Sequence, residues 1–304
     1  MDRFVFITNY SSNFEILYTG FKRDDRGFVC LPNPWDEIAR KEDNKVEFYR
    51  RLLLYAIPDS GEHFHFIVYG RLLEWISVSL PRVLKDTYKH ATVVCYFGDL
   101  INKHDMDFEV VKKECDYICT FDKGDAKKYD IAFCQEPYSG FDMSYVESVY
   151  DICFIGRAKD RLNKIINLFE YFEKNKLKCD FYIFDVPPDE LLYPEKICYN
   201  TYLDYKDVIR HIKSSKCVLE VMQGEAVSPS TRFAEALIYN KSLLTDCNSK
   251  EIKSVPNVFY FDEIEKIEID ELLREYNYTN NYWIDYFSIE KMIDRIIEIE
   301  KNKG

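Results

Sequence analysis

Glycine and proline are scarce in this sequence, since each occurs 10 times in 304 residues. Disordered, collagen-like and linker-rich chains are rich in these two residues, so those classes are excluded. A run of ~20 apolar residues, the length of a membrane span, is also missing. The segment that begins at Met1 has too short an apolar stretch, and no small-residue cleavage site, for a secretory signal. We therefore expect a cytoplasmic protein.

Positive charge is in deficit, with 41 Lys and Arg against 53 Asp and Glu and a net charge of −12. A duplex-binding protein needs a concentrated basic surface, so we expect no nucleic acid partner, and only a local basic patch stays open. The 10 cysteines lie mostly inside apolar runs, which is typical of buried thiols in a reducing compartment. Cys115 and Cys119 are the closest pair, but no second pair or histidine stands at zinc-ligand spacing from them. No structural zinc is predicted, and the predicted sites include no metal.

The residues that are present describe a densely packed globular chain, 47% hydrophobic with 24 Tyr and 22 Phe. At about 150 residues per domain, the length indicates two domains. Short apolar runs alternate with amphipathic stretches, which predicts β-α units around parallel sheets. The predicted strands are 4–8, 64–69, 92–97, 117–121, 149–155, 179–184, 216–221, 242–245 and 257–261. The predicted helices are 44–56, 72–88 with an interruption at Pro81, 160–175, 205–214, 231–239 and 288–301.

Two successive α/β halves of this kind fit a dinucleotide-binding enzyme, a periplasmic-type binding protein or a sugar transferase with two Rossmann-like domains. In each of them, ligands bind beyond the carboxyl ends of the strands. The fingerprint G-x-G-x-x-G is absent, which disfavours nicotinamide cofactors. The P-loop motif and the G-x-S-x-G nucleophile elbow are absent as well.

The most informative segment is the loop and helix over 223–240. Ser228 and Ser230 can cap the helix, and the free N–H groups at its start, with Thr231 and Arg232 in the first turn, suit a diphosphate. Glu235 lies one turn further along, where a carboxylate can accept hydrogen bonds from ribose hydroxyls. The alternative is that Arg232 and Glu235 form a surface i,i+3 ion pair on an ordinary helix.

A second candidate for phosphate binding follows the strand at 149–155. Gly156 permits close approach of the backbone, and Arg157, Lys159 and Arg161 supply cations. The alternative is a turn glycine followed by solvated charges that begin a helix.

Together these segments resemble GT-B glycosyltransferases of bacterial capsule, exopolysaccharide and lipopolysaccharide synthesis. The resemblance covers most of the chain from about residue 64 onward. It is carried by Phe154–Gly156 with Asp160–Arg161, Glu220, Thr231–Leu237, Asn240–Asp246, Asn257–Asp262, Tyr96–Asp99 and Thr120–Ala126.

The resemblance implies an α/β GT-B fold, in which two Rossmann-like domains with parallel sheets face a central cleft. It implies an acceptor-side domain over 1–147, a nucleotide-sugar domain over 148–287 and a last helix over 288–304 that crosses to the first domain. Arg232 and Glu235 match the phosphate-contacting and ribose-contacting positions, and Glu225 in the preceding loop joins the donor-binding residues. Glu225 and Glu235 are ten positions apart, and no Gly-Phe-Gly loop follows Glu225, so the retaining two-glutamate pattern is not met.

The activity implied is transfer of a sugar from a UDP- or GDP-linked donor to a glycan or lipid-linked acceptor in surface polysaccharide synthesis. It needs no cofactor and no metal. The enzymatic alternative is a nucleotide-sugar 2-epimerase or hydrolase of the same fold, and the non-enzymatic one is an inactive GT-B binding module. The basic, Trp-containing stretch over 71–85 would suit peripheral contact with the inner face of a membrane, or else forms a core-facing helix with one solvated side.

An inverting reaction needs a general base in the N-terminal half. Asp99 is the first candidate, because it follows a strand whose apolar run over 93–97 implies burial on both faces, which would raise the pKa of a carboxylate. Its alternative role is to cap the next segment. Asp122 is the second, with helix capping as its alternative role. His65 is the third; it shares one face of a strand with His63, and the two could be bases, paired ligands or structural residues.

Overall fold

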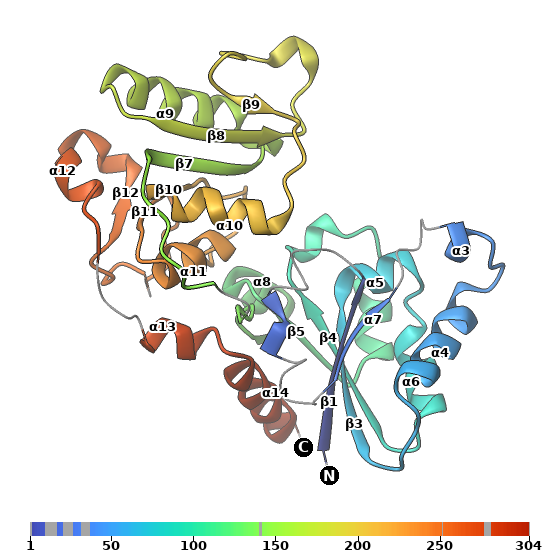
Figure 1. The fold of residues 1–304 in the computed structure, drawn as a ribbon. Helices are drawn as coiled ribbons and strands as arrows, with labels where there is room; N and C mark the ends of the chain where they lie inside the picture. The colour runs from blue at the N-terminus through green and yellow to red at the C-terminus, as the bar shows by residue number, and fades with distance from the viewer. Residues whose placement is uncertain are drawn as a thin grey trace. The chain divides into compact units, whose positions relative to one another are not determined.

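The computed structural model describes residues 2–9, 17–20, 27–31, 37–139, 142–250, 252–276 and 281–303. The chain forms two compact units: unit 1 comprises Met1–Gly140 with Phe287–Gly304, and unit 2 comprises Phe141–Tyr286. Each unit contains a six-stranded sheet whose neighbouring strands are all parallel, with helices along it (Figure 1). The predicted α/β class is confirmed.

Unit 1 has the strand order β2-β1-β3-β4-β5-β6. Its strands are β1 (Asp2–Asn9), β2 (Phe28–Leu31), β3 (His63–Tyr69), β4 (Ala91–Phe97), β5 (Tyr117–Thr120) and β6 (Ala132–Phe133). Its helices are α3 (Glu37–Arg40), α4 (Lys45–Ala56), α5 (Gly70–Trp75), α6 (Leu80–Thr87), the 3-10 turn η1 (Ile101–Lys103), α7 (Phe108–Glu114), α8 (Lys123–Tyr129) and α14 (Ile289–Lys303).

The central strands of unit 1 are buried on both faces, which is why their sequences are nearly unbroken apolar runs. Phe64, Phe66 and Val93 pack into the core that α4 and α6 help to form. The single helix predicted over 72–88 is two helices, α5 and α6, and Pro81 lies in the first turn of α6 instead of interrupting a helix. Proline is tolerated there because a first-turn N–H has no intrahelical partner.

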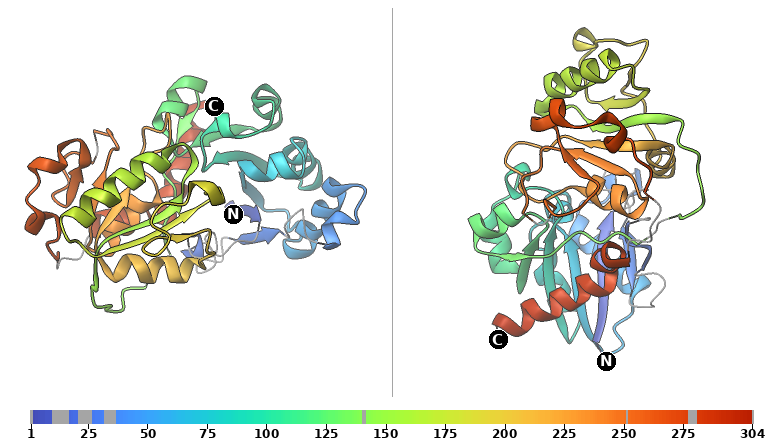
Figure 2. Two further views of the ribbon diagram at one scale, coloured as in Figure 1. Left: turned by 90° about the horizontal axis from the view of Figure 1, so that it is seen from above. Right: turned by 90° about the vertical axis from the view of Figure 1, so that its left-hand side faces the viewer.

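The C-terminal helix α14 belongs to unit 1 (Figure 2). The Ser288 hydroxyl accepts a hydrogen bond from the Lys291 N–H at 3.2 Å and caps its start. Met292 and Ile296 are fully buried, as their helical spacing predicts. Nε of Arg295 donates to the carbonyl oxygen of Phe133 at 3.0 Å, so the helix is fastened to the edge strand β6.

Unit 2 has the strand order β12-β11-β10-β7-β8-β9. Its strands are β7 (Tyr150–Arg157), β8 (Cys179–Phe184), β9 (Cys198–Tyr199), β10 (Ser215–Glu220), β11 (Ser242–Thr245) and β12 (Val258–Tyr260). Its helices are η2 (Lys159–Arg161), α9 (Leu162–Lys174), η3 (Pro188–Glu190), α10 (Tyr205–Lys213), α11 (Thr231–Ile238), η4 (Phe261–Lys266), α12 (Ile269–Leu272) and α13 (Asn281–Tyr286).

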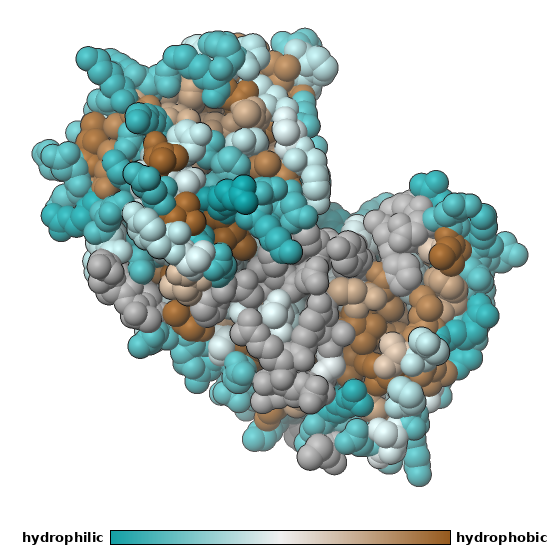
Figure 3. All heavy atoms as spheres, in the orientation of Figure 1, coloured by the Kyte–Doolittle hydropathy of each residue, from teal (hydrophilic) through white to brown (hydrophobic). Residues whose placement is uncertain are grey.

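The basic stretch over 71–85 packs into the core of unit 1. Leu72, Leu80 and Leu84 are fully buried, and the cations on the other side of α6 are paired, Arg82 with Glu114 and Lys85 with Asp116. Within the described ranges, no helix combines the length and the apolar character needed to cross a membrane. In the view of Figure 3, hydrophilic residues cover much of unit 2, and hydrophobic residues gather on the visible face of unit 1.

Candidate functional site

The strand order of unit 2 is that of a doubly wound dinucleotide-binding sheet. Its first strand, β7, lies beside its fourth, β10, and the chain continues outward from this pair in opposite directions. Ligands of such sheets bind at this switch point, beyond the carboxyl ends of the strands. Arg161 spans it, because its guanidinium donates to the carbonyl oxygens of Val221 and Arg157. Arg161 therefore ties the ends of β7 and β10 together.

The end of β7 and the turn that follows it present two exposed cations. Arg157 follows Gly156, and its guanidinium lies 2.9 Å from the carboxylate of Asp185, with both side chains more than half exposed. Lys159 is exposed and has a φ of +48°, in the left-handed region that non-glycine residues rarely adopt. Of the predicted donor-binding residues here, Arg157 and Lys159 face solvent, whereas Arg161 is engaged by the backbone.

Glu220, the last residue of β10, anchors the loop that leads to α11. One carboxylate oxygen accepts hydrogen bonds from the backbone N–H and the hydroxyl of Ser230, at 2.8 and 2.6 Å. The other accepts from the Thr245 hydroxyl at 2.6 Å. Burial raises the pKa of Glu220, and these hydrogen bonds oppose the rise. Glu220 thus holds Ser230 in place, and Ser230 caps α11 by accepting from the Arg232 N–H at 3.2 Å.

A buried polar chain crosses the first turns of α11. The guanidinium of Arg232 forms an ion pair with Glu235, and the other oxygen of Glu235 accepts a hydrogen bond from the hydroxyl of Tyr205 on α10. The side chain of Glu235 is 0% exposed, whereas that of Arg232 is 21% exposed. The i,i+3 pair considered from the sequence exists, but it is buried. Both oxygens of Glu235 are engaged inside the unit, and part of Arg232 faces outward.

This arrangement has the chemistry of an anion site. The N-terminal turn of α11 carries a partial positive charge, and Arg232, Arg157 and Lys159 lie near the same switch point, where Glu235 and Asp185 pair with the two arginines. Thr231 begins α11, and Glu225 is exposed in the loop before it. An added Cβ at Gly224 would lie 3.7 Å from Asp160, so this loop lies against the turn that follows β7.

Tyr205 was not predicted from the sequence, and neither was the pair of Lys164 and Asp246. Lys164 on α9 lies 2.6 Å from Asp246, whose second oxygen accepts from the Met222 N–H at 2.7 Å. These contacts join elements that are far apart in the chain. Local spacing carries no signal for them.

In unit 1, Asp99 follows β4 at the carboxyl edge of the sheet. Its side chain is 41% exposed, and one oxygen lies 3.4 Å from Nε and Nη2 of Arg71. Asp122 is 1% exposed and caps α8 by accepting from the Asp125 N–H at 3.0 Å. This is the capping arrangement that the sequence allowed for Asp122. Asp99 is therefore the more accessible of the two carboxylates.

His65 lies near the opposite edge, since it is the third residue of β3. Its side chain is 6% exposed, and its Nδ1 lies 2.8 Å from the carboxylate of Glu300 on α14. Burial lowers the pKa of His65, but the hydrogen bonds and charges of Glu300 and Asp2 outweigh it and raise the pKa overall. The structure does not bring His65 together with Asp99.

Glu136, in the segment after β6, was not predicted to have a role. An added Cβ at Gly98 would lie 3.4 Å from its carboxylate, so Glu136 is close to the residue before Asp99. Burial, and then the charge of Glu136, raise the pKa of Tyr18 and Tyr96. A second carboxylate thus lies at the carboxyl edge of unit 1.

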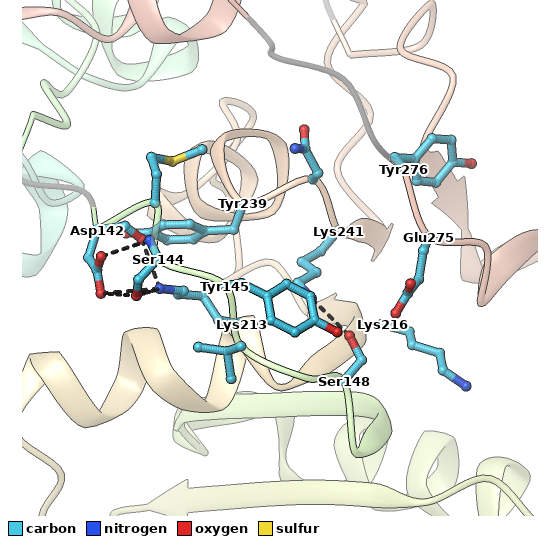
Figure 4. Close-up of a pocket in the computed structure, with 13 residues that line it drawn as sticks. Asp142, Ser144, Tyr145, Ser148, Lys213, Lys216, Tyr239, Lys241, Glu275 and Tyr276 are labelled. Carbon is cyan, nitrogen blue, oxygen red and sulfur yellow. Dashed lines mark hydrogen bonds and ion pairs between the residues drawn. The ribbon is translucent and has the colours of Figure 1, made fainter.

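A pocket of about 360 Å³ lies in unit 2 near the amino ends of β10 and β11 (Figure 4). Three lysines line it, but each has a partner: Lys213 contacts Asp142 and Ser144, Lys216 lies 3.0 Å from Asp151, and Lys241 lies 3.2 Å from the Ser148 hydroxyl. The pocket is at the edge of the sheet opposite the switch point. It is therefore separate from the candidate anion site.

No family model and no curated protein matches the chain. Solved structures do match. An alpha-glucosyltransferase in complex with UDP and a 13-mer DNA containing an HMU base has a TM-score of 0.63 and 10% identity, and the match covers 98% of this chain and 99% of that one. An alpha-glucosyltransferase in complex with UDP-glucose and DNA containing an abasic site has a TM-score of 0.57 and 12% identity, over 98% and 93% of the two chains.

These likenesses show the fold, which is GT-B with two Rossmann-like domains, and they confirm that prediction. The exclusion of nucleic acid is wrong, because structures with this fold are complexes with DNA. The error lies in the use of net charge. A total of −12 describes the sum over the surface, whereas phosphate contacts need only a local basic patch.

Proposed function

We propose that the chain is a glycosyltransferase that uses a UDP- or GDP-linked sugar and that unit 2 binds the diphosphate of this donor. The observation that carries the proposal is the partly exposed Arg232 in the first turn of the capped helix α11, beside the switch point of a Rossmann-order sheet. The match to proteins described as glucosyltransferases bound to UDP or UDP-glucose supports it.

In this proposal the site acts on the leaving group. When the bond between the sugar and the diphosphate breaks, negative charge grows on the phosphate oxygens. The guanidinium of Arg232 and the positive end of the α11 dipole stabilise that charge, and Arg157 and Lys159 add to the positive potential. Because side-chain cations supply the charge, we propose that transfer needs no metal. Glu235 holds Arg232 in position through the buried ion pair.

We propose Asp99 as the base that takes the proton of the acceptor hydroxyl. Its accessible side chain at the carboxyl edge of the unit 1 sheet supports this role. For the acceptor we propose a glycan or lipid-linked glycan of surface polysaccharide synthesis, as the motif resemblance implies. DNA bearing a hydroxyl is a second acceptor to test, since the matched structures contain DNA.

The experiment is calorimetric titration of the wild-type protein with UDP, GDP and CMP, followed by variants. Arg232→Ala should weaken binding by ~1.5–3 kcal/mol, the range for hydrogen bonds to charged groups. Because this change leaves the carboxylate of Glu235 unpaired and can destabilise the unit, Arg157→Ala combined with Lys159→Ala tests the same site through exposed residues. Arg210→Ala, on the 75% exposed arginine of α10, is the matched control.

Absence of nucleotide binding by the wild-type protein would exclude the donor site. If both Arg232→Ala and the double variant bind the nucleotide as tightly as the wild type does, α11 does not bind the donor and has only a structural role. Incubation with a nucleotide sugar alone, followed by NMR, distinguishes a transferase from an epimerase or hydrolase. Only the epimerase and the hydrolase consume the donor rapidly without an acceptor. Binding without any turnover would favour the inactive module.

A further inference from the structure

Two histidines and a carboxylate meet at the start of the unit 1 sheet. In β1 and β3, Asp2 pairs with His63 in the parallel register, and His65 is two residues further along β3. Alternate residues of a strand face the same side, so both imidazoles lie on one face, with ring centroids 4.3 Å apart. The nucleotide-sugar proposal uses none of these three side chains.

The ligand atoms converge on one point. Oδ1 of Asp2 lies 3.3 Å from Nδ1 of His63 and 3.4 Å from Nε2 of His65. One ligand atom from each of the three residues lies within 4.8 Å of the others. A tetrahedral zinc ion with bonds of about 2.0–2.1 Å holds its ligand atoms roughly 3.3 Å apart. The two separations between Asp2 and the imidazoles match that spacing.

The second nitrogen of each histidine is also positioned. Nδ1 of His65 lies 2.8 Å from the carboxylate of Glu300, and Nε2 of His63 lies 2.9 Å from the hydroxyl of Thr92. Histidines that bind metals almost always donate their other N–H to such an acceptor, which fixes the tautomer and the direction of the ring. With an ion bound, both rings would turn an unprotonated nitrogen toward it, and the ion would replace the hydrogen bond that Nε2 of His65 makes to Asp2.

From this geometry we propose that Asp2, His63 and His65 bind a divalent transition-metal ion of the zinc type, while Glu300 and Thr92 hold the other nitrogen of each histidine. His65 is 6% exposed, whereas the side chains of His63 and Asp2 are 42% and 65% exposed. Solvent therefore reaches one side of the ion and supplies the fourth ligand as water. The carboxylates of Asp2 and Glu300 balance its charge.

The ion would have a structural role. The cluster lies at the amino ends of β1 and β3, whereas Asp99 lies beyond the carboxyl end of β4. An ion here joins β1 to β3 directly and orders α14 through Glu300. The cysteine spacing, which predicted no structural zinc, does not bear on this site because it uses imidazole and carboxylate ligands.

The test uses the full chain, freed of any histidine tag and of bound metal, and titrated with Zn²⁺ by calorimetry and with Co²⁺ by visible absorption. We expect one ion per chain and the intense d–d absorption of tetrahedral cobalt. Asp2→Asn and His63→Gln change exposed side chains, so the fold should persist while affinity falls at least tenfold. Glu300→Gln should lower affinity by ~10–100-fold, as second-shell substitutions do.

His90→Gln, on an exposed histidine of the same unit outside the cluster, is the matched control and should bind as the wild type does. The proposal is overturned if the wild type binds no stoichiometric Zn²⁺, or if Asp2→Asn and His63→Gln bind it as tightly as His90→Gln. Each readout is independent of sugar transfer, so failure of this site leaves the nucleotide-sugar proposal intact.

Discussion

The hydroxyl of Tyr205 on α10 donates a hydrogen bond to the carboxylate of Glu235 on α11, and that carboxylate is fully buried. Arg232 neutralises the same carboxylate from one turn away. Since an unpaired buried charge is costly, the three side chains depend on one another. The position of the one partly exposed member, Arg232, is therefore set by packing between two helices.

Removal of the Tyr205 hydroxyl should destabilise unit 2. We expect Tyr205→Phe to lower the free energy of unfolding by ~1.5–3 kcal/mol, because one oxygen of Glu235 then lacks a donor in a buried site. Urea denaturation near neutral pH measures the change. Tyr202→Phe, on a tyrosine that is 79% exposed, should leave stability unchanged. Equal midpoints for the two variants would show that the hydrogen bond contributes nothing.

Glu235 has a positioning role in our proposal, whereas the motif resemblance implies contact with the ribose. We expect Glu235→Gln to lower the affinity for UDP and for 2′-deoxy-UDP by the same factor, about 10, or ~1.4 kcal/mol. The factor should be equal because the substitution acts through Arg232 and not through the ribose. Calorimetry with both ligands measures this, and Glu195→Gln, on an exposed glutamate of the same unit outside the site, is the control. A loss of affinity for UDP alone would instead support direct contact between Glu235 and the ribose.

Substitutions of Asp99 and of Arg232 should affect different steps: the first the rate of transfer, the second the affinity for the nucleotide. Asp99→Asn should leave nucleotide affinity nearly intact and reduce the transfer rate by ~10²–10⁴-fold, the usual contribution of a positioned base. Asp105→Asn, on an exposed aspartate of the same unit, controls for charge. If Asp99→Asn transfers sugar at the wild-type rate, Asp99 is not the base. Glu136→Gln would then test the second carboxylate at this edge.

Glu220 makes stability depend on pH. Its folded pKa is raised above the ordinary value of 4.5, mainly by burial, so the native state holds the proton more tightly than the unfolded chain does. Stability should therefore fall as pH rises from about 4.5 through the folded pKa and then level off. Glu220→Gln keeps an oxygen for Ser230 and cannot titrate, so the variant should gain stability relative to the wild type over this range.

Urea denaturation at a series of pH values measures that difference, with Glu225→Gln as the control. Subtraction of the wild-type stability curve from that of Glu220→Gln cancels the contribution of the other carboxyl groups that titrate in the same range. Parallel curves for Glu220→Gln and the wild type would contradict the raised pKa.

Periodicity predicted the central strands well, because strands buried on both faces must be apolar throughout. The run at 92–97 is β4, and the run at 179–184 is β8. Periodicity did not predict the edge strands β2, β6 and β9, and the last two have only two residues each. So short a segment carries no pattern of its own, and its pairing depends on the strand beside it.

The sequence by itself determined the α/β class, the capping serine before α11 and the presence of Arg232 in its first turn, since these depend on neighbours within a few positions. Only the tertiary structure decided that Glu235 is closed off by Tyr205, that Arg161 joins two strand ends and that Asp2 meets His63 and His65. The physical reason is that periodicity encodes which side of an element is buried. The partner that covers that side is chosen by sheet order and register, which join residues distant in the chain.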